Sequence, residues 1–246
     1  MVKKVIVVMP AYYAEKTLER TYNAIPKDSV DEIILVDDAS KDKTVEIAHN
    51  LGLKTIVHEK NKGYGGNQKT CYTNALKAGA EIVIMLHPDF QYDPGVIPKM
   101  VELIKDEKAD IVYGSRMLVS GMAKKGGMPC WKRLGNRILT GYFNIMLGTK
   151  LTDAATGYIA YNRKVLETIP FLKNDDGFTF DEEVIIQGVA FNFKAEEVAI
   201  PTRYETDSSS INFVKSVRYG KSIFTKVLKY RLSKLGLIKY DLLIKN

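Results

Sequence analysis

Cysteine, tryptophan and long apolar runs are scarce in this chain of 246 residues. Cys71 and Cys130 are too few for a disulfide framework and lack the spacing of a zinc site, so we expect both to be reduced and structural. No stretch approaches the roughly 18 apolar residues of a membrane-spanning helix. The apolar N-terminal segment ends at Pro10 without a small-residue cleavage site, which predicts a buried strand instead of a signal peptide.

Acidic residues are almost absent from the end of the chain. Residues 213–246 hold nine Lys and Arg residues and one acid, Asp241, so this segment carries +8 and the remaining residues carry −1 of the total +7. The positive charge therefore describes one surface. A nucleic-acid-binding domain would carry a basic patch across a folded face, so no nucleic-acid partner is expected.

Val- and Ile-rich runs alternate with helical spacing through the first half of the chain. Strands are predicted over 4–10, 31–38, 54–59, 81–86 and 109–116, with helices over 14–25, 41–52, 65–80 and 94–106. Continuous apolar runs between helices indicate an α/β fold with a mostly parallel sheet covered on both faces. Ligands of such sheets bind at the carboxyl ends of the strands.

The second half is less regular. A mobile glycine-rich loop is predicted over 117–130, helices over 131–148 and 180–191, a strand and a helix over 157–169, and a strand over 193–201. We expect one domain over residues 1–212, followed by a basic amphipathic helical segment over residues 213–246.

Acids follow the second predicted strand. Ser40 and Asp42 fit a helix cap, but capping does not explain the adjacent Asp37 and Asp38 at the strand tip. Carboxylates there can accept hydrogen bonds from a nucleotide base or ribose, so we interpret both as nucleotide-binding residues.

The third strand is followed by NKGYGGN, which includes Gly63 and Asn67. Its glycines would let backbone N–H groups approach a ligand at a helix N-terminus. The segment lacks the ending of a P-loop and the spacing of a dinucleotide fingerprint. A flexible turn explains it equally well.

The fourth strand ends in LHPDFQYDP. Asp93 and Pro94 fit a helix start, whereas Asp89 and Gln91 would point the same way along an extended segment. Such oxygen ligands suit Mg²⁺ or Mn²⁺, and the neighbouring His87 is more compatible with Mn²⁺. The metal would bridge a diphosphate and neutralise a leaving phosphate.

The ordered motifs PAYYAE, VDDASKDKT, NKGYGGN, HPDFQYDP and GSR resemble those of the family 2 inverting glycosyltransferases of the GT-A fold. Over about residues 3–213 the chain is most similar to the dolichyl-phosphate mannose synthase and polyprenyl-phosphate glycosyltransferase group. The resemblance implies transfer of a sugar from a UDP- or GDP-linked donor, with Mg²⁺ or Mn²⁺, to a polyprenyl phosphate or a lipid-linked glycan.

The resemblance also implies residue roles. Pro10, Tyr12, Glu15, Asp37 and Asp38 would contact the nucleotide, Asp89 and Gln91 would bind the metal, and Arg116 would lie near the sugar or acceptor phosphate. His87 stands where the family carries the first acid of its metal motif, so it is either a ligand or a neighbour of the ligands. The mannose synthases carry an Arg-x-x-Gly-x-Ser-Lys segment after their last strand, and in the corresponding PTRYETDSSSINF only Arg203 and the serines could substitute for it.

Asp181 begins a predicted helix in FTFDEEVIIQ. It is either a partner of the helix dipole or the general base that transfer to a hydroxyl needs. A lipid phosphate acceptor needs no base, and Asp181 would then bind the donor sugar or a cation.

The segment from Phe213 to Leu235 has a helical pattern. One predicted face holds Phe213, Val217, Phe224, Leu228 and Leu235, and Lys215, Arg218, Lys226 and Lys229 lie broadly opposite. This pattern is typical of an interfacial membrane helix, so we expect a peripheral protein at the inner face of the cell membrane. The helix could instead pack on the domain or form an oligomer contact, and Trp131 with Lys132, Arg133 and Arg137 could add a second membrane contact.

Other functions remain open at this point. A non-catalytic nucleotide-sugar-binding protein would bind a nucleotide without turnover. A transferase could also act on a soluble or protein-linked glycan hydroxyl. A nucleotidyltransferase would need a glycine-rich phosphate loop directly after the first strand, where PAYYAE stands instead.

Overall fold

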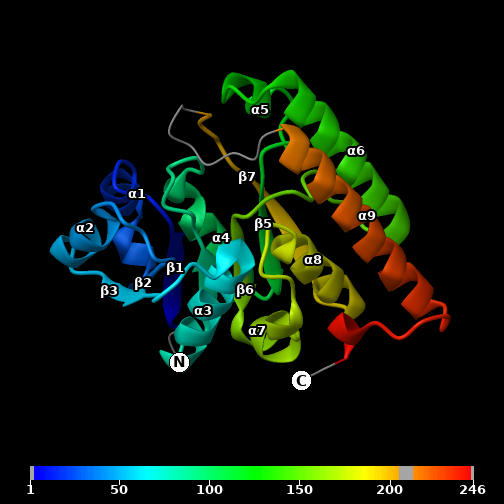
Figure 1. The fold of residues 1–246 in the computed structure, drawn as a ribbon, viewed down its shortest axis with the longest axis horizontal. Helices are drawn as coiled ribbons and strands as arrows, with labels where there is room; N and C mark the ends of the chain where they lie inside the picture. The colour runs from blue at the N-terminus through cyan, green and yellow to red at the C-terminus, as the bar shows by residue number, and fades with distance from the viewer. Residues whose placement is uncertain (1–2, 205–212, 245–246) are drawn as a thin grey trace.

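The computed structural model describes residues 3–204 and 213–244, and for residues 213–219 it describes the backbone alone. A seven-stranded sheet with the order β3-β2-β1-β4-β6-β5-β7 forms its centre (Figure 1). The strands are β1 (Val5–Ala11), β2 (Glu32–Asp37), β3 (Lys54–Val57), β4 (Ile82–Met85), β5 (Ile111–Ser115), β6 (Ile159–Asn162) and β7 (Ala195–Ala199). β6 pairs antiparallel with β4 and β5, and the other strand pairs of the sheet are parallel. The predicted mostly parallel sheet is therefore confirmed.

Helices cover both faces of this sheet. They are α1 (Leu18–Ala24), α2 (Thr44–Asn50), α3 (Gly63–Lys77), α4 (Ile97–Lys105), α5 (Met122–Lys125), α6 (Cys130–Leu147), α7 (Arg163–Thr168), α8 (Phe180–Ala190) and α9 (Phe213–Lys234). One buried cluster joins α1, α2 and α4 to the sheet, and a second joins α3, α6, α7, α8 and α9 to its other face. Alternate β1 residues enter the two clusters, as with Val7 and Val8, because successive strand side chains point to opposite faces.

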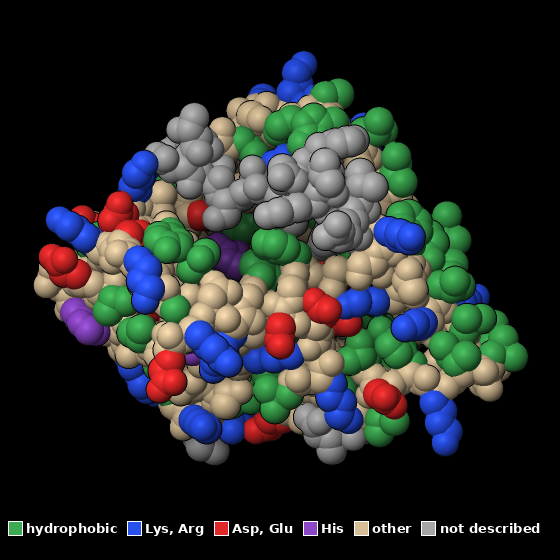
Figure 2. Space-filling model, viewed as in Figure 1, with side chains coloured by type: hydrophobic (Ala, Val, Ile, Leu, Met, Phe, Trp, Pro, Cys, Tyr) green, Lys and Arg blue, Asp and Glu red, His purple; other side chains and the backbone are tan. Residues whose placement is uncertain are grey.

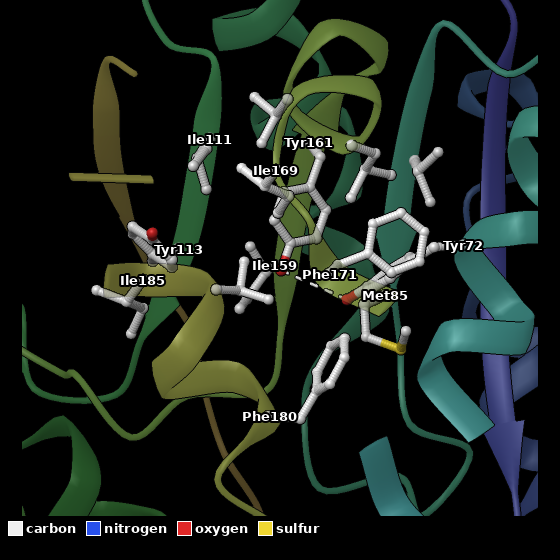
Figure 3. Close-up of a cluster of buried hydrophobic side chains, with 14 of the residues drawn as sticks. Tyr72, Met85, Ile111, Tyr113, Ile159, Tyr161, Ile169, Phe171, Phe180 and Ile185 are labelled. Atoms are coloured by element: carbon white, nitrogen blue, oxygen red, sulfur yellow. Dashed lines mark hydrogen bonds between the residues drawn. The ribbon is translucent and has the colours of Figure 1, made fainter. Parts of the chain in front are cut away.

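The second cluster holds α3 and α8 together beneath the strand ends. Figure 3 shows Tyr72 of α3 beside Phe180 of α8 and Tyr161 of β6. Tyr72 is fully buried, and its ring makes an edge contact with Tyr161 at a centroid distance of 5.4 Å. The Tyr72 ring also stacks on that of Phe180 at a centroid distance of 6.0 Å, so α3 is held close to the first turn of α8.

The predicted mobile loop over 117–130 is partly wrong. It contains α5, and Ala123 and Met128 are buried. A Cβ on Gly126 would collide with the backbone carbonyl of Thr202, so the glycine lets this segment pack closely against the chain after β7. The role of Gly126 is therefore to permit close packing, and not to make the segment mobile.

The C-terminal helix α9 runs beside α6 and α8 (Figure 1). Ile223, Val227 and Tyr230 are buried against the domain. Lys226, expected broadly opposite the apolar face of the helix, pairs with Glu183 of α8 at 2.6 Å. The helix therefore packs by a face that the sequence pattern did not single out, while Phe224 and Leu228 stay exposed.

The structure describes the side chains of only some of the other residues expected on α9. The side chains of Phe213, Lys215, Val217 and Arg218 lie outside the described residues. Lys229 and Leu235 are exposed. Within residues 3–204 and 213–244, no helix is both long enough and apolar enough to cross a membrane.

Candidate active site

The carboxyl ends of β1, β2 and β4 meet at one edge of the sheet because these strands are parallel neighbours. Each is followed by a non-glycine residue with positive φ: Tyr13 at 53°, Ala39 at 63° and Phe90 at 55°. Such conformations are strained for residues with a Cβ and cluster at functional sites. Figure 2 shows a hollow near the centre of one face of the molecule, with a histidine side chain inside it.

The segment after β4 is a turn, so the predicted extended segment with aligned Asp89 and Gln91 is wrong. The positive φ of Phe90 reverses the chain, and the Oδ1 atom of Asp89 accepts a hydrogen bond from the backbone N–H of Gln91 at 3.0 Å. Gln91 is only 7% exposed. The expected helix start at Asp93 and Pro94 is confirmed, because the Asp93 side chain accepts from the N–H of Gly95 at the start of a 3₁₀ helix (Pro94–Val96) that leads into α4.

Metal-binding residues are sparse around this turn. The described part of the chain contains no group of three His, Cys, Asp or Glu side chains that could hold a metal ion. A cation shared with substrate phosphates needs only one or two protein carboxylates, as Mg²⁺ sites in phosphate-transfer enzymes illustrate. Asp89 fits that mode of binding, and a metal cage made by the protein alone does not fit this edge.

Two arginines lie over the ring of Phe90. The Cζ atom of Arg20 is 3.9 Å from the ring centroid and that of Arg203 is 4.5 Å away. The backbone N–H of Arg203 donates to the carbonyl of Gln91 at 2.9 Å. The Nη1 atom of Arg203 is buried and has no hydrogen-bond partner among the residues that the structure describes. The structure therefore brings Arg203 to the turn that carries Asp89, with a guanidinium donor available for an anion.

Arg116 is placed differently. Its Nε and Nη2 atoms donate to the two carboxylate oxygens of Asp153 at 2.6 and 2.8 Å, and Nη2 also donates to the carbonyl of Ala155. Its Nη1 atom lies 3.3 Å from the hydroxyl of Tyr204. Four of the five N–H donors of a guanidinium are thus engaged, and the charge is paired within the protein. Arg116 orders the loops after β5 and before β6.

The two acids at the end of β2 have separate environments. Asp38 accepts from the Nδ1 of His58 at 2.7 Å and from the backbone N–H groups of Lys62 and Gly63 at 2.8 and 3.0 Å. Its carboxylate thus caps the start of α3. Asp37 is fully buried, and its Oδ1 atom has no hydrogen-bond partner within residues 3–204 and 213–244. Because buried polar atoms are nearly always paired, Asp37 offers the open acceptor of the two.

The glycines of α3 serve packing, and the prediction that their N–H groups face a ligand is not met. Gly65 and Gly66 donate to the carbonyl of Asp176, at 2.8 and 3.3 Å. Gly63 has φ +84°, and a Cβ there would lie 2.6 Å from the same carbonyl oxygen. Asn67 donates to the carbonyls of Val36 and Ala11 and so ties the ends of β1 and β2 together.

The residues after β1 differ in exposure. Pro10 is buried within β1, opposite Val36. Tyr12 is 53% exposed and its ring contacts that of Tyr13 at a centroid distance of 4.5 Å. Glu15 accepts from the backbone N–H of Lys43 at 3.0 Å. Tyr12 therefore presents an open aromatic surface, whereas Pro10 and Glu15 shape the loops around it.

Asp181 is buried at the start of α8, where the fold brings it to α3. Its Oδ2 atom accepts from the Tyr64 hydroxyl at 2.6 Å, and its Oδ1 atom accepts from Gln68 at 3.0 Å. Burial raises the pKa of Asp181 from 3.8 to about 6, against the opposing effect of these two hydrogen bonds. The Nε2 of His87 lies 3.0 Å from the same hydroxyl. Tyr64 and Gln68 were not predicted, although their spacing of four residues on a helix places them on one face.

Comparison with known proteins supplies the family. Residues 6–170 match glycosyl transferase family 2. An uncharacterised protein of Methanocaldococcus jannaschii is 33% identical over 207 residues, which is 84% of this chain and 84% of that protein. The UDP-N-acetylglucosamine–dolichyl-phosphate N-acetylglucosaminyltransferase of Methanococcus voltae is 27% identical over 250 residues, or 95% of this chain and 98% of the relative.

A solved structure shares the fold. Glucosyl-3-phosphoglycerate synthase from Mycobacterium tuberculosis, crystallised with Mn²⁺, uridine diphosphate and phosphoglyceric acid, superposes with a TM-score of 0.67. The match is 18% identical and covers 97% of this chain and 80% of that one. Together with the matched residues and the mostly parallel sheet, these similarities establish that the chain is a glycosyltransferase of the GT-A fold and belongs to glycosyl transferase family 2.

Proposed function

We propose that this glycosyltransferase moves a sugar from a UDP- or GDP-linked donor to a polyprenyl phosphate or a lipid-linked glycan at a membrane surface. The observation that carries the proposal is the convergence at one sheet edge of the open oxygen of Asp37, the exposed ring of Tyr12 and the Asp89 turn with Arg203. The acceptor class is supported by the name of the Methanococcus voltae relative, which describes transfer to dolichyl phosphate.

The nucleotide occupies the ends of β1 and β2. The Oδ1 atom of Asp37 accepts a hydrogen bond from the base or ribose, which satisfies a buried acceptor that has no partner in the described part of the chain. Tyr12 packs its ring against the nucleotide. Asp38, Asn67 and Gly63 act indirectly, because their polar groups hold the start of α3 and the ends of the strands in place.

The diphosphate lies beside the turn after β4. Arg203 lies beside this turn, because its backbone N–H donates to the carbonyl of Gln91. Its guanidinium donates to the phosphate oxygens. Asp89 and His87 would hold Mg²⁺ or Mn²⁺, with His87 using the ring nitrogen that Tyr64 does not contact. Such a cation, when bound, neutralises charge on the leaving diphosphate. The Mycobacterium tuberculosis neighbour crystallised with Mn²⁺ supports this choice of cofactor.

With a polyprenyl phosphate acceptor, the reaction is a single displacement. An oxygen of the acceptor phosphate forms a bond to the anomeric carbon as the bond from that carbon to the donor diphosphate breaks, which inverts the anomeric configuration. The nucleoside diphosphate leaves with the bonding electrons. A phosphate oxygen is already an anion, so no proton has to be removed and Asp181 serves to orient the donor sugar.

The membrane-facing surface combines the exposed sides of α6 and α9. Its exposed apolar residues on α6 are Trp131, Leu134, Ile138 and Ile145. Those of the C-terminal segment are Phe224 and Leu228 on α9 and Leu235 directly after it. Exposed basic residues border them, among them Arg137, Lys221 and Lys229. Figure 2 shows hydrophobic and basic side chains interspersed at the right of the view. A surface of this kind suits the headgroup region of an anionic membrane.

A nucleotide panel tests the donor site. UDP, GDP, dTDP and CDP are added with Mn²⁺, Mg²⁺ or chelator, and the melting temperature is recorded for wild type and Asp37→Asn. A ligand that binds only the folded state raises the melting temperature. We expect one nucleotide to give the largest shift and Asp37→Asn to reduce it. No shift with any nucleotide at millimolar concentration would contradict the proposal.

A hydroxyl acceptor is the second candidate, and Asp181 favours it. A buried carboxylate with a pKa near 6 is well matched to accept a proton near neutral pH. Asp181→Asn separates the two acceptors. Transfer to a phosphate would persist at a measurable rate, whereas transfer to a hydroxyl would fall by about 10² to 10⁴ because its general base is gone.

A further inference from the structure

Three side chains that are distant in sequence form one hydrogen-bonded chain inside the site. Tyr64 lies in the first turn of α3, His87 follows β4 and Asp181 lies in the first turn of α8. The Tyr64 hydroxyl oxygen is 2.6 Å from Asp181 Oδ2 and 3.0 Å from His87 Nε2. The rings of Tyr64 and His87 are stacked, with centroids 5.2 Å apart and an interplanar angle of 17°, so both rings are fixed.

The surroundings leave this chain little room to rearrange. A Cβ on Gly157 would lie 2.8 Å from the Tyr64 hydroxyl and 2.9 Å from His87 Nε2, so the Gly157 backbone closes one side. The other oxygen of Asp181 is held by Gln68, whose Oε1 atom accepts from the Tyr72 hydroxyl at 2.9 Å. Tyr64, Gln68 and Tyr72 are spaced by four residues and present one face of α3 to Asp181.

The direction of hydrogen donation follows from the number of protons. Tyr64 has one hydroxyl hydrogen and donates it to the Asp181 carboxylate. Its oxygen can then only accept from His87, which places the hydrogen of the neutral imidazole on Nε2. The ring lone pair of His87 is therefore on Nδ1. His58 provides a contrast, because its Nδ1 lies 2.7 Å from an Asp38 oxygen and must donate there.

We propose that His87 and Tyr64 are positioning residues of the transferase, in which His87 donates to Tyr64 and Tyr64 donates to Asp181. This order holds the Asp181 carboxylate in one orientation and leaves Nδ1 as the nitrogen with which His87 can contact a ligand. The kinetic consequence rests on the proposed function. The position of the hydrogen on His87 is a property of the folded protein and does not depend on it.

The test is an imidazole ¹H–¹⁵N correlation spectrum of the uniformly ¹⁵N-labelled full chain at pH 8. Two-bond couplings distinguish a ring with hydrogen on Nε2 from one with hydrogen on Nδ1, and His87→Gln assigns the signal. We expect Nε2–H for His87 and Nδ1–H for His58. A wild-type spectrum with Nδ1–H on His87 would overturn the proposal, because Tyr64 would then donate to His87.

A matched pair of variants isolates the hydroxyl. Tyr64→Phe keeps the ring and removes the donor, so the single-tautomer pattern of His87 is expected to disappear. Tyr113→Phe removes a buried hydroxyl from the core cluster against which Tyr64 packs, and is expected to leave the His87 pattern unchanged. An unchanged His87 pattern in Tyr64→Phe would contradict the proposed order of donation.

Kinetics supply the second readout. Loss of an outer hydrogen-bonding partner commonly lowers activity by about 10- to 100-fold, and we expect Tyr64→Phe to lower kcat by that factor with little change in the KM of the donor. A KM effect without a kcat effect would contradict a positioning role. Absence of any transfer by the wild type would instead contradict the proposed function, and the spectrum would still decide the order of donation.

Discussion

The Nζ atom of Lys226 lies 2.6 Å from the Oε1 atom of Glu183, and this ion pair joins α9 to the first turn of α8, two residues after Asp181. Glu183 is 3% exposed, and its other oxygen accepts from the backbone N–H of Asp175 at 2.6 Å. The basic C-terminal helix is thus anchored to the helix that carries Asp181. It supports the site as well as presenting an outer surface.

Replacing Lys226 by Met should leave the Glu183 charge buried without its cation. Breaking a buried pair from one side commonly costs about 3 to 5 kcal/mol, and partial exposure of Lys226 places this one near the lower limit. Urea unfolding measures the change. Lys229→Met, at an exposed position of the same helix, is the control and should stay within about 0.5 kcal/mol of wild type. Equal losses for the two variants would contradict a buried ion pair.

Stability should depend on the ionisation of Asp181. Its folded pKa, about 6, lies above its ordinary value of 3.8, so the folded state holds the proton more tightly than the unfolded chain. Stability from this group is therefore full below about pH 4 and is lost as the pH rises through 6. Asp181→Asn does not titrate, so its stability relative to wild type should improve by roughly 2 to 3 kcal/mol between pH 4 and pH 7.

Urea unfolding of wild type and Asp181→Asn at several pH values measures this difference. Acids distant from Asp181 titrate equally in both proteins and cancel, whereas the pKa of the neighbouring Glu182, raised by burial and by the Asp181 charge, is lower in the variant. A difference that stays constant from pH 4 to pH 7 would show that Asp181 is not destabilised by burial.

Asp89 should account for the metal dependence of nucleotide binding. The melting temperature is compared with nucleoside diphosphate alone and with nucleoside diphosphate plus Mn²⁺. Asp89→Ala should retain the shift caused by the nucleotide and lose most of the additional shift caused by Mn²⁺, because it removes the carboxylate proposed to hold the cation together with His87. Asp106→Ala, at the exposed C-terminus of α4, is the control. If Asp89→Ala keeps the full additional melting-temperature shift caused by Mn²⁺, the metal does not bind at the turn after β4.

Vesicle binding tests the membrane-facing surface. Leu134 and Ile138 are 59% and 58% exposed on one side of α6. Burying such a side chain contributes roughly 1.5 to 3 kcal/mol, so replacing both by Ser should weaken sedimentation with anionic vesicles by at least about tenfold. Leu172→Ser, at an equally exposed position outside α6 and α9, should bind like wild type. Unchanged vesicle binding by the double variant would contradict a membrane role for this surface. A wild-type dimer that dissociates in the double variant would assign the surface to an oligomer contact.

The strands and most helices could be predicted because their patterns are local. The Val- and Ile-rich runs that form β1, β2 and β4 are continuous. Each is followed by a segment whose apolar residues have the spacing of a helix. The direction of β6 could not be predicted, because an apolar run reads alike in a parallel and an antiparallel strand. The family could also be predicted from the sequence, and the prediction is confirmed, because its motifs are short local segments at the strand ends.

The contacts within the site could be predicted only in part. Tyr64 and Asp181 are separated by 117 residues, and nothing local indicates that α8 turns its first residues toward α3. The positive φ of Phe90 overrode the expectation of an extended segment after β4. Arg116 resembles a phosphate-binding arginine in sequence, but Asp153, 37 residues later, takes up its charge.

Transfer itself is the most direct measurement. The protein is incubated with UDP- and GDP-linked sugars labelled in the sugar, Mn²⁺, and vesicles containing polyprenyl phosphate, and label in the organic phase is counted after extraction. We expect label to enter the lipid from one donor, with release of an equal amount of nucleoside diphosphate, and Arg203→Ala to lower the rate by at least about tenfold. No lipid-linked label from any donor, together with transfer to a soluble glycan hydroxyl that Asp181→Asn abolishes, would contradict a polyprenyl phosphate acceptor.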